Sequence, residues 1–238
     1  MPSGRIPAVK LLAIESSSDL FSAALSLDGR IVERSAPCGA SHSENALPIV
    51  RALLEGESLA LQALDGIAFG AGPGSFTGLR LAAGCAQGLA FGLDLPVIGI
   101  NTLEALALGA GDGLIYACAD ARMNEVYCAA YRVAGERVET VLAPVVVPPS
   151  HAPLPPGQDW RGAGSGFGAY GAALQARLGP GLAAIDAAAR PRAGAIARLA
   201  APRFSRGEAH DPALAAPLYV RDKIALTTQE RLAAGGQK

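Results

Sequence analysis

The sequence predicts an α/β protein built from two similar lobes, and three observations support this fold class. Apolar runs of strand length alternate with segments of helical periodicity along most of the chain. Two of the apolar runs end in glycine-rich turns that lead directly into helices, as is typical of α/β units. The order of elements in residues 1–108, three strands and then alternating helices and strands, partly returns after residue 109.

The composition is that of a chain with a large apolar core and little net charge. Half of the 238 residues are hydrophobic, and a net charge of −1 gives no overall attraction to nucleic acid. The four cysteines lack CxxC spacing, which predicts free thiols and a reducing cytoplasm. Residues 1–7 lack an apolar signal core and no apolar run reaches the length of a membrane span, so we expect a cytoplasmic protein without membrane contact.

Three strand-like segments open the chain. Residues 9–14 form a continuous apolar run, which is typical of a central strand. The segments 21–27 and 30–34 flank an Asp28-Gly29 dipeptide, which is a strong signal for a hairpin turn. We therefore expect an antiparallel meander of three strands.

Helices and further strands are expected to follow this meander. Ser41 and Glu44 have the spacing of a capping box, and behind them apolar residues recur at helical spacing over 46–54. The other expected elements of this half are a short helix at 58–64, strands at 66–70 and 96–100, and a helix at 103–108 capped by Asn101 or Thr102.

The turn between residues 70 and 80 reads Gly-Ala-Gly-Pro-Gly-Ser-Phe-Thr-Gly-Leu-Arg. Its glycines and proline break a strand, and Ser75 or Thr77 can cap the helix expected at 76–91. Free N–H groups at that helix start suit a phosphate. The alternative is a tight connection that binds no ligand. The turn matches neither a Walker A loop nor a Rossmann fingerprint, because the required lysine and third glycine are absent.

The helix after this turn has small residues through its middle. Gly84 and Gly88 are four residues apart and share one face. Each interior glycine costs about 1 kcal/mol of helix propensity, so we expect the close approach of another backbone in return.

The second half repeats the plan of the first after a glycine-rich boundary at 109–113. Strands are expected at 114–120, 126–131 and 137–147, a strand-to-helix turn at 160–166, and helices at 167–178 and 193–205. A duplicated unit of this kind is the layout of the actin-like, sugar kinase and Hsp70 ATPase fold, in which a ligand lies between the lobes. We accordingly expect an N-terminal lobe over residues 1–108 and a smaller C-terminal lobe over 109–238.

Acidic residues are the main candidates for chemistry in such a cleft. Glu15 and Asp120 each end the first strand of one half, so they can face each other and hold Mg²⁺ and phosphate. The alternative is that both carboxylates cap turns. Residues that could add phosphate contacts are Ser16, Gly72, Gly74 and Ser75.

Other reaction centres find no support in the sequence. His42, His151 and His210 form no HxxxH or HExxH pattern, so no metal site is expected. No serine stands in a G-x-S-x-G motif or beside an evident base. We expect no catalytic residue of these kinds.

Several motifs resemble the TsaB family, formerly called YeaZ, in the family's order and over nearly the whole chain. They are residues 12–18, 42–44, 72–80, 103–107, 120–127 and 217–221. Gly-Pro-Gly-Ser-Phe-Thr-Gly-Leu-Arg is highly specific, and Asp-Ala-Arg-Met-Asn-Glu-Val-Tyr supports it independently. One departure is Glu15, where the family more often has aspartate.

The resemblance implies an actin-like fold of two lobes and a non-catalytic subunit of the bacterial tRNA threonylcarbamoyladenosine synthase. The catalytic paralogue, TsaD, binds its metal through an HxxxH pattern, whose positions here are Thr102 and Leu106. TsaD would transfer the threonylcarbamoyl group from threonylcarbamoyl-AMP to adenosine 37 of tRNA, with the ATPase TsaE joining the complex. No cofactor is expected to bind tightly to this subunit, while ATP or ADP and Mg²⁺ belong to the complex.

The resemblance also implies how the subunits pair, through a bundle of the first two long helices of each N-terminal lobe. Some apolar residues of these helices must face the lobe's own sheet, and a homodimer of the isolated chain stays open. The candidate contacts are Leu47, Val50 and Leu54 on the first helix, with Leu79, Ala82, Gly84, Ala86 and Gly88 on the second.

Rival functions remain at this point. A nucleotide-dependent kinase or ATPase of the same fold would use Glu15, Asp120 and the turn at 72–75. A glycoprotease-like peptidase would need a metal triad or a paired nucleophile, and the sequence shows neither. A third rival is a binding module that acts alone on tRNA, although no basic stretch with interleaved aromatic residues predicts it.

Overall fold

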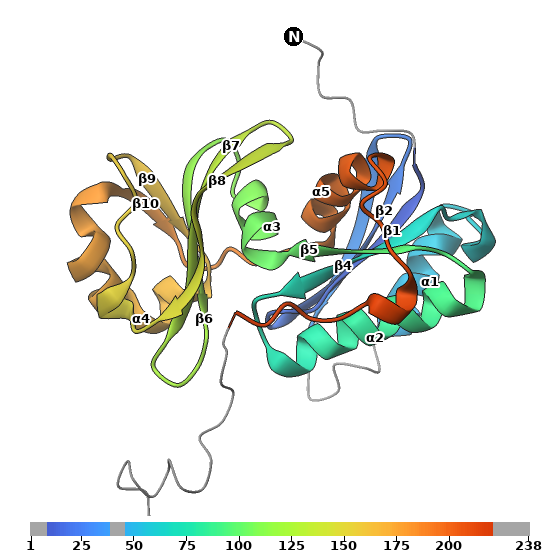
Figure 1. The fold of residues 1–238 in the computed structure, drawn as a ribbon, viewed down its shortest axis with the longest axis horizontal. Helices are drawn as coiled ribbons and strands as arrows, with labels where there is room; N and C mark the ends of the chain where they lie inside the picture. The colour runs from blue at the N-terminus through green and yellow to red at the C-terminus, as the bar shows by residue number, and fades with distance from the viewer. Residues whose placement is uncertain (1–8, 39–45, 221–238) are drawn as a thin grey trace, which may run out of the picture.

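The computed structural model describes residues 9–38 and 46–220, which form two five-stranded sheets with helices packed on them (Figure 1). The strand order is β3-β2-β1-β4-β5 in the first sheet and β10-β9-β6-β7-β8 in the second. Counted from β8, the second sheet repeats the first strand for strand, so the predicted duplication is confirmed. The capping box at 41–44, His42 included, lies outside the described residues.

The first sheet contains the predicted meander. β1 pairs antiparallel with β2, and β2 pairs antiparallel with β3 across the turn at Asp28 and Gly29, whose φ values are 51° and 89°. Two consecutive positive φ values suit the twist of a two-residue hairpin. The strands are β1 (Leu11–Glu15), β2 (Leu20–Leu27), β3 (Arg30–Pro37), β4 (Gly66–Gly72) and β5 (Val97–Asn101).

The central strand β1 is buried on both faces, which explains its continuous apolar sequence. Leu11 and Ala13 belong to an apolar cluster with α5 (Ala193–Ser205). Leu12 and Ile14 belong to another cluster, on the face covered by α1 (Ala46–Gly56) and α2 (Phe76–Leu93). The helices α1 and α2 therefore lie on the face of the sheet opposite to α5 (Figure 1).

The two helices that follow β4 and β5 each begin at a side chain that caps the helix. Ser75 caps α2, since its hydroxyl accepts the Gly78 N–H at 3.4 Å. Asn101 caps α3 (Thr102–Gly109) by accepting two backbone N–H groups. The helix predicted at 58–64 is wrong: only a 3₁₀ turn forms, Leu61–Ala63, because Ser58 adopts a left-handed φ of 50° and β4 begins soon after.

The second sheet includes one strand that the sequence did not predict. β10 pairs in parallel with β9 and is the counterpart of β5. Its sequence, Leu-Ala-Ala-Ile-Asp, has low strand propensity and is largely exposed at the sheet edge, so no alternation marks it. The other elements are β6 (Gly113–Asp120), β7 (Val126–Ala134), β8 (Arg137–Val147), β9 (Trp160–Ala163), α4 (Ser165–Leu178) and β10 (Leu182–Asp186).

The chain consists of two repeated units, β1 to α3 and β6 to α5. The last helix of each unit lies between the two sheets (Figure 1). α5, from the second unit, packs on β1 and β2, whereas α3, from the first unit, packs on β6 and β7. Leu106 of α3, Ile196 of α5 and Ile115 of β6 belong to one apolar cluster that joins both lobes. The range 109–238 consequently does not coincide with one lobe, because α5 lies on the first sheet.

The segment after α5 returns along α2 toward the cleft (Figure 1). His210 bridges to Val97 at the edge of β5, and the Gln87 side chain donates to the Pro212 carbonyl at 2.9 Å. The Leu218 N–H donates to the Ala71 carbonyl at 2.7 Å. Within residues 9–38 and 46–220, no helix has the length and apolarity needed to cross a membrane.

Two glycines of α2 predict opposite effects of the same substitution. A Cβ at Gly78 would overlap the carbonyl oxygen of Ser16, whereas no described atom lies within 4 Å of a Cβ at Gly84. We expect Gly78→Ala to lower the free energy of unfolding by about 3 kcal/mol. Gly84→Ala should raise it by up to about 1 kcal/mol through helix propensity. Urea unfolding of both variants measures the difference, and equal stabilities would contradict this packing.

Candidate functional site

A pocket of about 620 Å³ lies between the lobes, and we call it the interlobe pocket. Its volume is in the range of small-molecule sites. The turn after β1, the turn before α2, α3, the end of β6 and the segment after α5 supply its walls. Residues that line it include Ser17, Asp19, Gly74, Ser75, Thr102, Asp120, Arg122, Ser165, Arg190 and Tyr219.

Only some of the residues that were predicted to contact a phosphate line this pocket. Gly74, Ser75 and Asp120 do, whereas Ser16 and Gly72 are not among its lining residues. The Asp120 carboxylate accepts the Arg122 N–H at 2.8 Å and pairs with its guanidinium at 3.1 Å. Asp120 therefore caps the turn that follows β6, which is the alternative considered for it above.

Glu15 does not face Asp120, so the joint metal–phosphate site predicted from these two carboxylates is wrong. Glu15 is completely buried and is not among the lining residues of the pocket. One carboxylate oxygen accepts the Ser17 N–H, and the other has no hydrogen-bond partner among the described residues. This second oxygen lies against Gly70, where any Cβ would collide with it.

The glycine-rich turn is closed against the turn that follows β1. The Ser75 N–H donates to the Ser17 carbonyl at 2.8 Å, and a Cβ at Gly74 would lie 2.6 Å from the Ser17 Cβ. The hydroxyl of Thr102 donates to the Pro73 carbonyl. The Ser75 N–H is thus not free to bind a phosphate. The contacts of Ser75 and Gly74 with Ser17 favour the tight connection over a phosphate loop at this turn.

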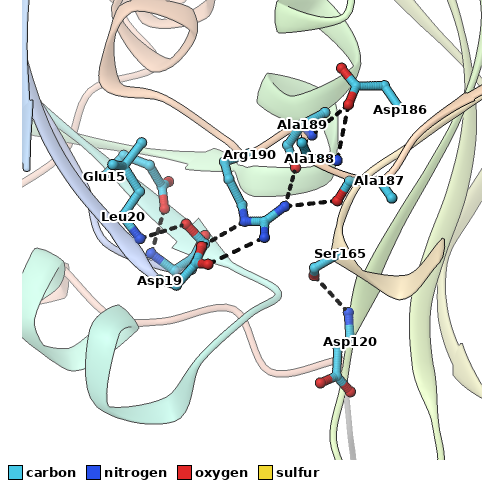
Figure 2. A network of polar contacts seen from close by, with 12 residues as sticks. Glu15, Asp19, Leu20, Asp120, Ser165, Asp186, Ala187, Ala188, Ala189 and Arg190 are labelled. Carbon is cyan, nitrogen blue, oxygen red and sulfur yellow. Dashed lines mark hydrogen bonds and ion pairs between the residues drawn. The ribbon is translucent and has the colours of Figure 1, made fainter. Parts of the chain in front are cut away.

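The charges around the pocket are paired with each other, and Figure 2 shows the pair of Asp19 and Arg190. Arg190 binds both oxygens of Asp19, at 2.6 and 3.2 Å, and this contact lowers the pKa of Asp19. Across the pocket, the Asp120 N–H donates to the Ser165 hydroxyl at 3.1 Å. The pairs Asp19–Arg190 and Asp120–Arg122 leave these four side chains with no net charge.

No metal-binding group of three or more His, Cys, Asp or Glu side chains occurs in the described part of the chain. Thr102 and Leu106 stand at the two positions where the resemblance to TsaD would place metal-binding histidines. Thr102 is buried and bonded to Pro73, and Leu106 packs in the interlobe cluster.

A second pocket, of about 590 Å³, lies between α1 and α2, and we call it the helix groove. Its lining combines apolar and charged side chains, namely Leu47, Val50, Arg51, Leu54, Glu55, Ser58, Leu59, Ala60, Leu61 and Leu89. Leu47 is 56% exposed, although it is a large apolar residue. Leu89 of α2 lines the groove, and on the same helix Gly84 and Gly88 are exposed.

The structure divides the eight candidate interface residues into three groups. Leu79, Ala82 and Ala86 are buried. Ala82 and Ala86 belong to the lobe's own core, so this part of the predicted contact set is wrong. Val50 and Leu54 are buried in the same core but also line the helix groove, while Leu47, Gly84 and Gly88 face outward. The groove residues after α1, Ser58 to Leu61, are not in the predicted contact set.

The buried Glu15 carboxyl predicts a pH-dependent stability. Burial raises the pKa of Glu15 from 4.5 to about 7, against the opposing effect of its hydrogen bonds from Ser17 and Ser16. The folded state holds this proton more tightly than the unfolded chain, so stability falls as the pH rises from about 4.5 to about 7. Ionisation of Glu15 should lower the free energy of unfolding by about 3 kcal/mol over this pH range, and the Glu15→Gln variant should lack this decrease.

Urea unfolding between pH 4.5 and 8 measures the effect. Glu55→Gln, at an exposed carboxylate, is the matched control and should keep the wild-type slope. A Glu15→Gln variant whose stability follows the wild-type pH dependence would rule out a proton on Glu15.

Comparisons with known proteins place the chain in a family. The family model described as TsaD, tRNA N6-adenosine threonylcarbamoyltransferase, matches residues 36–228. The tRNA threonylcarbamoyladenosine biosynthesis protein TsaB of Escherichia coli K12 is 34% identical over 230 residues, which are 91% of this chain and 96% of that protein. The protein of the same name from Haemophilus influenzae is 45% identical over 121 residues, 49% and 51% of the two chains.

Solved structures agree with the sequence matches. YeaZ from Pseudomonas aeruginosa superposes with a TM-score of 0.81 at 36% identity, covering 89% of this chain and 99% of that one. A second Pseudomonas aeruginosa protein, described as uncharacterized with similarity to peptidase YeaZ, gives 0.83 at 37% identity, with coverages of 90% and 100%. The actin-like fold of two lobes is confirmed, and the chain belongs to the TsaB family, also called YeaZ.

Proposed function

We propose that this chain is a non-catalytic partner subunit in the synthesis of threonylcarbamoyladenosine in tRNA. The names of its curated relatives assign those proteins to this biosynthesis, and the similarity to one of them covers 91% of the chain. In this proposal the chain pairs with the catalytic subunit TsaD through the helix groove and the exposed glycines of α2. The modification of tRNA would take place in the cytoplasm.

The exposed face of α2 is the observation that carries the pairing step. Gly84 and Gly88 are exposed one helical turn apart, with no described atom within 4 Å of a Cβ at either position. Neither glycine is needed for packing within the described chain, although each lowers helix propensity. A face without side chains lets a second helix approach closely. The exposed Leu47 in the adjacent groove adds apolar surface for the same contact.

The geometry of the turns at the interlobe pocket supports a division of labour between the subunits. The Gly74–Ser75 turn is bonded to Ser17, and Glu15 is buried away from the pocket. We assign the transfer from threonylcarbamoyl-AMP to adenosine 37 to TsaD. The ATPase TsaE, with ATP or ADP and Mg²⁺, would join at the level of the complex.

The pairing step predicts that a bulky side chain on the glycine face blocks TsaD but leaves the fold intact. We expect Gly84→Leu to weaken the heterodimer at least about 100-fold, because the added side chain holds the helices apart. Size-exclusion chromatography of the variant mixed with TsaD, followed by a calorimetric titration, measures the loss.

Gly171→Leu is the matched control. Gly171 is also a helical glycine, in α4 of the second lobe, and no described atom lies within 4 Å of its Cβ position. This variant should form the heterodimer with wild-type affinity. An unchanged heterodimer for Gly84→Leu would overturn the proposed contact face.

A nucleotide-dependent kinase or ATPase remains the alternative function, and it makes the opposite prediction. Because Ser75 N–H is bonded to Ser17 and Asp120 to Arg122, we expect no saturable binding of Mg²⁺-ATP by the isolated chain in calorimetry. Binding that is lost on Asp120→Ala would replace the partner-subunit proposal with the kinase or ATPase. Release of phosphate or ADP by the chain alone would have the same consequence.

A further inference from the structure

We propose that the mouth of the interlobe pocket binds an unpaired nucleotide of an RNA loop, whose base stacks on a platform of two aromatic rings and one arginine. The platform consists of Phe76 and Arg80 on α2 and Tyr219 in the segment after α5. Both rings also line the pocket. The choice of RNA as the source of the nucleotide rests on the proposed role in tRNA modification, and it gives this chain a contact of its own with the substrate.

The three platform side chains lie against one another at the surface. The Arg80 guanidinium carbon is 3.4 Å from the centroid of the Phe76 ring, and the Phe76 and Tyr219 centroids are 6.5 Å apart. Phe76 is 45% exposed and Tyr219 is 48% exposed. Nucleobases stack on exposed rings and guanidinium planes of this kind. Because residues 76 and 219 are far apart in the chain, no continuous basic stretch with interleaved aromatic residues marks the platform in the sequence.

The backbone next to Tyr219 is fixed to the first sheet, so its ring is held in place before any ligand binds. The Leu218 N–H donates to the Ala71 carbonyl at 2.7 Å. The Leu218 carbonyl oxygen would lie 2.8 Å from a Cβ at Gly72, which has a φ of 120°, so this close approach requires glycine. A platform that is ordered in advance does not pay the entropy of ordering when a base binds.

The charge at the pocket mouth favours a phosphate-bearing ligand. The four charged residues that line the pocket form the pairs Asp19–Arg190 and Asp120–Arg122, so their charges cancel. Arg80 stacks on Phe76 and pairs with no carboxylate within the described residues. The mouth therefore carries a local positive charge, although the chain as a whole has a net charge of −1. Such a charge attracts the phosphates that flank an unpaired base.

Three serine hydroxyls of the pocket remain available as hydrogen-bond donors. Ser18, Ser75 and Ser165 line the pocket, and each hydroxyl oxygen accepts a backbone N–H, at 3.1 to 3.4 Å. None of the three donates to an acceptor within the described residues. Bases, ribose and phosphate are rich in acceptor atoms. A peptide would also bring N–H donors, but the pocket carboxylates that could accept them are already paired with arginines.

The test measures the binding of an RNA hairpin with an unpaired loop to the full chain alone, in buffer with EDTA. A 2-aminopurine in the loop reports stacking through the quenching of its fluorescence. We expect a dissociation constant on the order of 10⁻⁵ M. A fully paired RNA duplex and free AMP are the comparison probes, and both should bind at least about 10-fold more weakly. Paired bases are not available for stacking, and AMP lacks the neighbouring phosphates.

Two variants remove one part of the platform each. Tyr219→Leu keeps an apolar side chain and loses the ring, so it should weaken hairpin binding about 10-fold and abolish most of the quenching. Tyr219→Phe keeps the ring and should bind like the wild type. Arg80→Gln should weaken binding and lower the slope of log K against log salt by about 0.7, because one phosphate contact is lost.

The matched controls are Phe91→Leu and Arg137→Gln. Phe91 is an aromatic residue of α2 that is 57% exposed, and Arg137 is an exposed arginine at the start of β8. Neither residue lines the interlobe pocket. Both variants should bind the hairpin with wild-type affinity, quenching and salt dependence.

Three results would overturn the proposal. The first is a wild-type chain that does not bind the hairpin, or a Tyr219→Leu variant that binds it as Phe91→Leu does. The second is AMP binding as tight as hairpin binding, which would make the ligand a free nucleotide. The third is a Tyr219→Leu variant that loses TsaD but keeps the hairpin, which would make the platform a protein contact. Because the chain is tested alone, a failure of the Gly84→Leu pairing experiment leaves these readouts unaffected.

Discussion

The exchange of helices between the two units is the constraint on which the rest of the structure depends. Each unit sends its last helix to the space between the sheets, where α3 and α5 share one apolar cluster. β1 needs α5 to bury Leu11 and Ala13, and β6 needs α3 to bury Ile115 and Ala117. Neither sheet can complete its core from its own unit, so the two lobes form one cooperative body.

This arrangement also explains where the chain leaves room for other molecules. The inner faces of both sheets are occupied by α3 and α5, and the turns at the cleft are bonded to each other through Ser17 and Ser75. The outer layer of α1 and α2 has no further element on it apart from the segment after α5, within the described residues. The helix groove and the exposed glycines of α2 are therefore not covered by another described helix or strand.

The parts of the fold that depend on local chemistry could be predicted from the sequence. Asp28-Gly29 defines its hairpin, Ser75 and Asn101 cap their helices, and the apolar run of β1 marks a central strand. Features decided by tertiary packing could not be. The exposed edge strand β10 carries no alternating pattern, and nothing near Glu15 in sequence shows that its carboxyl turns under Gly70. The inward faces of Ala82 and Ala86 also depend on where the sheet lies.

The late position of α5 in the chain has a consequence for synthesis on the ribosome. β1 emerges early, but the helix that covers Leu11 and Ala13 ends only at Ser205. At about 5–20 residues per second, roughly 10–40 s separate the two events. During that interval the nascent chain has an apolar sheet face that no helix covers. The amino-terminal lobe thus cannot mature ahead of the rest, and both lobes finish at nearly the same moment.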